Sequence, residues 1–94
     1  MIEKVSTFDA AEFLDSPEKR AEFLAVALED YDATHFRNAL SIVARSQNMT
    51  EIAEDAGISR QGLYKALGDD GDPKLSTLLG IMQALGIKMT TEAA

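Results

Sequence analysis

Residues 49 to 67 read Met-Thr-Glu-Ile-Ala-Glu-Asp-Ala-Gly-Ile-Ser-Arg-Gln-Gly-Leu-Tyr-Lys-Ala-Leu and predict two short helices joined by a tight turn. Thr50 is a candidate cap for the first helix, whose early turns carry acids that suit the positive end of a helix. Gly57 supplies the permissive backbone position that a corner of three to four residues requires, and Ser59 can cap a second helix of about eight residues. The pattern predicts a helix-turn-helix.

Two sets of side chains support this interpretation. The apolar positions, which would pack where the two helices cross, are Ile52, Ala53, Ala56, Ile58, Leu63 and Leu67. The side chains left outward on the second helix are Ser59, Arg60, Gln61, Tyr64 and Lys65. Their hydroxyls, hydrogen-bonding groups and cations suit the base edges and phosphates of DNA. The alternative is a helical corner in a core, with a solvated face that happens to carry an arginine and a lysine.

Composition is that of an ordinary globular chain. Its 94 residues are 46% hydrophobic and 27% charged, which leaves room for one domain whose stability oligomerisation would improve. No apolar run approaches the ~18 residues of a membrane span. The N-terminus, Met-Ile-Glu-Lys-Val-Ser, lacks the apolar core of a signal peptide, so we expect a cytoplasmic protein with no membrane partner.

The residues that most enzymes and metal sites need are scarce. Cysteine is absent and His35 is the only histidine, so thiolate sites, thiol nucleophiles and histidine clusters are excluded. Three acids lie in the loop Asp69–Asp72, but they lack the alternating order of a calcium loop. We therefore expect no enzymatic activity, no cofactor and no metal.

The charge of the chain is unevenly distributed. The formal net charge is −7, which by itself argues against a polyanionic partner. Residues 1–36 carry nine acids and three bases, a net −6. Residues 37–67 carry four bases and three acids, a net +1, and residues 68–94 carry four acids and two bases, a net −2. The segment expected to contact DNA is thus separated in sequence from most of the acids, and an acidic N-terminal third would steer a cationic partner.

Capping signals predict three helices ahead of residue 49. Asp9 and Glu12 form an Asp-headed capping box for a turn or two of helix. The neighbouring Phe8, Phe13 and Leu14 would either dock on the core or contact another protein. Ser16 and Pro17 begin a second helix that we expect to reach about Asp30. Its apolar face would consist of Leu24, Ala27, Leu28 and Tyr31.

Asp32 is the candidate cap of the third helix, which we expect to end near Gln47 and Asn48. Its apolar stripe follows the helical period and consists of Phe36, Ala39, Leu40, Val43 and Ala44. Gln47 and Thr50 stand at the entrance to the motif, where side chains and backbone N–H groups can meet a phosphate. Arg45 is either a second such contact or an exposed arginine without a role.

Ser76 is predicted to cap a last helix that ends at Gly86, followed by a short extended tail. Its wide apolar surface consists of Leu78, Leu79, Ile81, Met82 and Leu85. That surface either forms a homodimer contact or is covered by the monomer's own core. The chain is therefore predicted to be an all-α, phage-repressor-like helix-turn-helix domain of about five helices over residues 1–94. It would comprise an acidic helical extension (1–32), a core (33–86) and a tail (87–94).

The order of these elements resembles that of addiction-module antidote proteins, small antitoxins with a phage-repressor-like helix-turn-helix. The resemblance covers roughly residues 7 to 90 and is most specific in Gly57–Leu67, with Arg60 and the pair Leu63-Tyr64. The family often has Gly-Asn-Pro before its last helix. Here that loop reads Gly71-Asp72-Pro73, which removes support for a phosphate contact from it.

The resemblance implies a cognate toxin, usually a small basic protein of the RelE/ParE kind, and repression of the shared operon by a dimer. The leading hypothesis is thus a type II antitoxin that represses its own promoter. Arg60 and Gln61 would read base edges in the major groove, while Ser59, Tyr64, Lys65, Thr50 and Gln47 would contact phosphates. Two alternatives are a free-standing phage-type repressor without a toxin and a toxin-binding protein that does not bind DNA.

Overall fold

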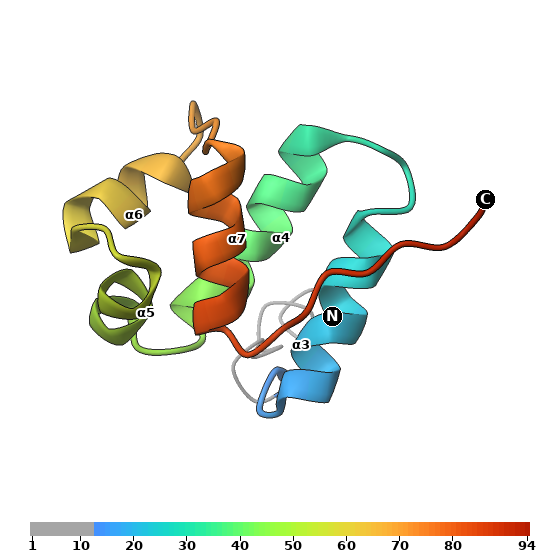
Figure 1. Cartoon of the computed structure of the whole chain (residues 1–94), viewed down its shortest axis with the longest axis horizontal. Helices are drawn as coiled ribbons and strands as arrows, with labels where there is room; N and C mark the ends of the chain where they lie inside the picture. The colour runs from blue at the N-terminus through green and yellow to red at the C-terminus, as the bar shows by residue number, and fades with distance from the viewer. Residues whose placement is uncertain (1–12) are drawn as a thin grey trace, which may run out of the picture.

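The computed structural model describes residues 13–94, and within that range the chain forms five helices and no strand (Figure 1). The helices are α3 (Pro17–Ala27), α4 (Ala33–Arg45), α5 (Met49–Ala56), α6 (Arg60–Ala66) and α7 (Leu75–Ala84). The predicted all-α fold is confirmed. The helix predicted from Asp9 and Glu12 lies outside the described residues.

Helix α3 begins as predicted but ends early. The Ser16 hydroxyl accepts a hydrogen bond from the Lys19 N–H at 3.2 Å, and Pro17 occupies the first helical position. The prediction that the helix continues to about Asp30 is wrong. Its last residue is Ala27, with Leu28 as the C-cap. Tyr31, predicted to belong to the apolar face of this helix, has φ 56° and is 90% exposed. Leu28 is also exposed, so only Leu24 and Ala27 of the predicted face are buried.

Helix α4 follows the predicted pattern closely. The Asp32 carboxylate accepts hydrogen bonds from the backbone N–H groups of Thr34 and His35, at 2.9 and 3.2 Å. All five residues of the predicted stripe are buried. The helix ends at Arg45, slightly before the expected position, and Ser46 caps its C-terminus.

Helices α5 and α6 are joined by a turn at residues 57–59, an arrangement compatible with the predicted helix-turn-helix. Gly57 has φ 78°, as the tight turn requires, and the Ile58 N–H donates to the Ala53 carbonyl at 3.0 Å. The prediction that Thr50 caps α5 is wrong. The cap is Asn48, whose side chain accepts from the Glu51 N–H at 3.1 Å, so Thr50 is the second residue of the helix.

Helix α7 also begins earlier than predicted. Its N-cap is Lys74, with no side-chain cap hydrogen bond, and the Leu78 N–H donates to the Lys74 carbonyl at 2.9 Å. Because the backbone is already helical at Leu75, the prediction that Ser76 caps this helix is wrong. Gly86 ends the helix as predicted, with φ 75° and an Ile87 N–H bond to the Met82 carbonyl at 3.0 Å.

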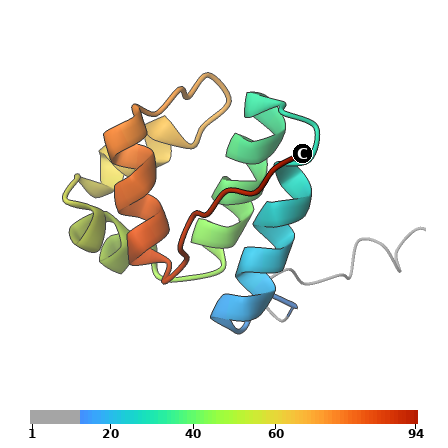
Figure 2. The same cartoon turned by 45° about the vertical axis from the view of Figure 1, so that its right-hand side comes forward.

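One core connects these elements. Helix α5 contacts α4, α6 and α7, and its contact with α7 is the most extensive. Helix α3 packs on α4, on the side of the molecule away from α6, as the two views in Figures 1 and 2 agree. The buried side chains from every described helix include Leu24, Leu40, Ile52, Leu63 and Ile81. Leu14, ahead of α3, is fully buried in the same core, whereas Phe13 is 40% exposed.

Among the described residues, no helix is both long and apolar enough to cross a membrane.

Candidate nucleic-acid interface

Helix α6 is fixed to the protein by one side and exposes the other. Leu63 is fully buried, and Leu67, just beyond the helix, is also buried. Because residues three and four apart share a helix face, this anchoring leaves the opposite face free. The residues exposed on that face or at its start are Ser59, Arg60, Gln61 and Lys65. The structure therefore places these four predicted site residues on one exposed element.

The start of α6 is held by its own cap. The Ser59 hydroxyl accepts a hydrogen bond from the Gly62 N–H at 2.9 Å, as a serine N-cap does. This confirms the predicted capping role of Ser59. Since the hydroxyl is exposed and rotates about its own bond, it can also donate outward.

Tyr64 lies at the centre of a cluster of cations. It is half-buried and packs against the core. The Arg60 guanidinium carbon lies 5.5 Å from the Tyr64 ring centroid, and that of Arg45 lies 5.1 Å from it. The Arg60 guanidinium also donates to the Tyr64 hydroxyl across 3.5 Å, and Arg45 donates to the Ser41 hydroxyl at 3.0 Å. Cation–π contacts of this kind contribute about 0.5–1 kcal/mol each at exposed sites, so the ring restrains both arginines.

Arg45, for which the sequence left open a phosphate contact or no role, lies beside the predicted residues through a contact that the sequence does not reveal. It is the last residue of α4, far from Tyr64 along the chain, and only the packing of the helices brings the two together. Asn48, the cap of α5, is a residue that the sequence prediction missed. An Asn with a Glu three residues later is a recognisable capping signal, so Asn48 and Glu51 could have identified it.

The two remaining predicted residues lie before α6. Thr50 is exposed on the first turn of α5. Gln47 is half-buried, and its side-chain amide donates to the Ser46 hydroxyl at 2.9 Å and to the Leu14 carbonyl at 3.5 Å. Gln47 therefore ties the end of α4 to the segment before α3. It would have to release these hydrogen bonds to reach a phosphate.

The charge around α6 is locally positive. Residues 56–68 contain Arg60 and Lys65 and no acid, in a chain whose net charge is −7. Arg45 adds a third cation through its contact with Tyr64. Helix α5 carries exposed acids, Glu51, Glu54 and Asp55, so the cationic surface is confined to α6 and the end of α4. The exposed side chains with the charge to meet a phosphate backbone are therefore concentrated on α6 and at the end of α4.

Comparisons with known proteins identify the family of this chain. Residues 4–93 match a family described as "Probable addiction module antidote protein". An uncharacterized protein of Haemophilus influenzae is 40% identical over 92 residues, which cover 98% of this chain and 95% of that protein. No solved structure shows a significant match. Since the match spans nearly the whole chain, this protein belongs to the family of probable addiction module antidote proteins, and an antidote implies a cognate toxin as its partner.

Proposed function

We propose that this antidote is a type II antitoxin that binds operator DNA through α6, represses its own promoter and neutralises a small basic toxin of the RelE/ParE kind. The observation that carries the DNA half is the exposed, acid-free face of α6, where Arg60, Gln61 and Lys65 stand clear of the core. A helix anchored on one side by leucine and exposed on the other can enter the major groove. Both activities belong in the cytoplasm, and neither requires catalysis, a metal or a cofactor.

Each exposed side chain of α6 has a distinct role in this proposal. Arg60 and Gln61 are at the N-terminal end of the helix, the end that reads base edges in helix-turn-helix proteins. Lys65, one turn further along, contacts a phosphate, as do Ser59 and Tyr64 at the margins of the helix. Thr50, on α5, contacts a phosphate of the DNA backbone. Gln47 also contacts a phosphate, once its hydrogen bond to the Leu14 carbonyl is broken.

The protein acts as a homodimer in this proposal, because one short helix contacts too few bases for tight binding. The candidate contact is on α7, where Leu75 is 68% exposed and Leu79, one turn later, is 48% exposed. Two copies joined there would present two α6 helices to a near-palindromic operator, with half-sites about 34 Å apart. Sedimentation equilibrium of wild type and Leu79→Lys tests this, since the substitution should yield a monomer. A Leu79→Lys variant that stays dimeric would move the contact elsewhere.

Fluorescence anisotropy with the DNA upstream of the gene tests the role of α6. Arg60→Ala should cost about 1–3 kcal/mol and relax the preference at one base pair. Lys65→Ala should weaken binding to every sequence and reduce the salt slope by about one. Lys88→Ala, an exposed lysine in the C-terminal tail, is the control and should change little. Equal losses for both α6 variants on all sequences would contradict the assigned roles.

A second candidate function keeps the toxin and gives up DNA binding. It is favoured by the net charge of −7 and by the exposed acids of α5. The same titration separates the two candidates. If micromolar dimer does not bind the upstream DNA at low salt, the DNA-binding part of the proposal is wrong and the protein is a toxin-binding protein. A free-standing phage-type repressor is disfavoured, because the family is one of antidotes.

A further inference from the structure

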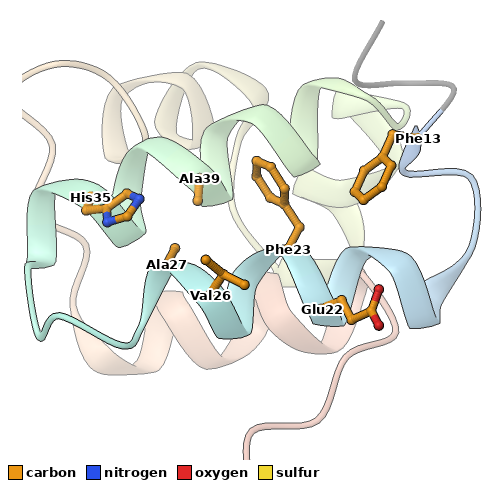
Figure 3. Close-up of a pocket in the computed structure, with 7 residues that line it drawn as sticks. All are labelled: Phe13, Glu22, Phe23, Val26, Ala27, His35 and Ala39. Atoms are coloured by element: carbon orange, nitrogen blue, oxygen red, sulfur yellow. The ribbon is translucent and has the colours of Figure 1, made fainter. Parts of the chain in front are cut away.

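An open groove lies between α3 and α4 (Figure 3). Figure 1 shows α3 on the side of the molecule away from α6. The volume of the groove is about 390 Å³. Phe13, Phe23 and Val26 form one wall, His35 and Ala39 of α4 form the other, and Glu22 lies at the edge. The groove plays no part in the proposed DNA contact.

The groove is apolar and accessible. Val26 is 61% exposed, although valine is among the residues that a folded chain most often buries. The rings of Phe13 and Phe23 meet edge to face, with centroids 6.5 Å apart, and so make this wall of the groove aromatic. Beyond the groove, Ile42 follows His35 and Ala39 at helical spacing and adds a side chain that is 41% exposed. The surface suits an apolar side chain of a partner.

The charges beside the groove indicate what else the partner carries. Residues 13–32 hold six acids against Lys19 and Arg20, a net −4. Lys19 is paired with Asp15 at 3.3 Å, and Arg20 donates to the Leu14 carbonyl at 3.1 Å, so both cations are engaged locally. Glu18 and Glu22 lie one turn apart on the exposed side of α3, and neither forms an ion pair among the described residues. The accessible charge at this edge is therefore negative.

We infer that the α3–α4 groove is the docking site for the cognate toxin, which inserts an apolar side chain between Phe13, Phe23 and Val26 and places lysine or arginine against Glu18 and Glu22. This rests on the proposed function, in which the toxin is a basic protein. Complementary charge at the rim accelerates association, and the desolvated apolar anchor supplies most of the affinity. Since α6 lies at the other end of the molecule, toxin bound here leaves the DNA-reading face uncovered (Figures 1 and 2).

Two matched pairs of substitutions test the groove. Val26→Lys places a charge in it, whereas Ala25→Lys makes the same change at the neighbouring exposed residue of α3, which does not line it. Glu22→Lys reverses a charge at the rim, and Glu54→Lys makes the identical reversal on α5. The probe is the purified product of the reading frame beside the gene. Its affinity for each full-length variant is measured by isothermal titration calorimetry, with circular dichroism as the check on folding.

Val26→Lys should weaken toxin binding by at least about tenfold, as expected for a central interface residue, and Ala25→Lys by less than about twofold. Glu22→Lys should weaken binding more than Glu54→Lys at low salt, and this difference should shrink at high salt. Equal affinity of Val26→Lys and wild type would overturn the assignment of the groove while leaving the antitoxin proposal intact. Loss of dimer in Val26→Lys without loss of toxin affinity would also overturn it and identify a second copy as the occupant. If wild type does not bind the probe, toxin neutralisation itself fails.

Discussion

Replacing Gly71 with alanine should destabilise the fold more than the same change at the glycines that end α5 and α7. A β-carbon at residue 71 would overlap the carbonyl oxygen of Ala66 and lie 2.6 Å from its carbonyl carbon and 2.8 Å from the carbonyl oxygen of Lys65. These are backbone atoms at the end of α6. Since no side-chain rotation relieves the overlap, the loop after α6 must move.

The cost follows from what that movement breaks. The Gly71 N–H donates to the Gly68 carbonyl at 2.9 Å, and the Arg37 guanidinium donates to the Gly71 carbonyl at 3.2 Å. Losing two such bonds costs about 1–3 kcal/mol, and the strain of overpacking adds about 1–3 kcal/mol. We therefore expect a loss of at least about 2 kcal/mol, a large part of the ~5–15 kcal/mol that stabilises a small domain.

Gly57 and Gly86 supply the matched controls. Both have positive φ, 78° and 75°, but a β-carbon added at either position would have no neighbouring atom within 4 Å. Alanine there should cost only the conformational penalty of about 1–2 kcal/mol. Urea denaturation followed by far-UV circular dichroism gives the order of stabilities. If Gly71→Ala resists urea as well as Gly57→Ala does, the overlap with α6 does not fix the loop, and the reasoning is refuted.

Three further predictions concern the helix caps, the dependence of stability on pH, and the binding of toxin and DNA at the same time. Asn48→Ala should lower stability by about 1 kcal/mol and Thr50→Ala by much less, because only Asn48 caps α5; thermal melts decide the order. The hydrogen bond from His35 at 2.9 Å, with that from the Asp32 N–H, lowers the pKa of Asp30 below 3.8. The stabilising effect of this ionised carboxylate is present above its ordinary pKa and is lost as pH falls through the lowered pKa. Asp30→Asn should therefore lower the urea midpoint at about pH 6, and the difference from wild type should shrink as pH falls through the lowered pKa. Toxin added to the DNA-bound antitoxin should retard the complex further in a native gel, whereas release of free DNA would mean that the two faces overlap.

Local signals are sufficient to predict most of the helical framework. Ser16, Asp32 and Ser59 are correctly predicted caps, because each has a short polar side chain that accepts a hydrogen bond from a backbone N–H in the first turn of the helix that follows. Gly57 and Gly86 are correct because a positive φ is a local requirement. The exposed residues of α6 follow from the same periodicity, since Leu63 fixes which side faces the core.

The errors arise where a local pattern has two solutions. A hydroxyl two residues inside a helix has the same neighbours in sequence as one at the cap, so the predictions for Thr50 and Ser76 are misplaced. The predicted apolar stripe of α3 extends to Tyr31, because the spacing of apolar residues does not show where the helix ends and the chain turns. The contact of Arg45 with Tyr64 and the groove beside α3 depend on tertiary packing, which no spacing in the sequence encodes.

The arginine-flanked ring of Tyr64 also makes the protein its own optical reporter. The chain has no tryptophan and two tyrosines, and the other, Tyr31, is almost fully exposed. Changing Tyr31 to phenylalanine would leave a single fluorophore, positioned beside Arg45 and Arg60. Any ligand that draws those guanidinium groups away from the ring would then alter the emission of an unlabelled protein.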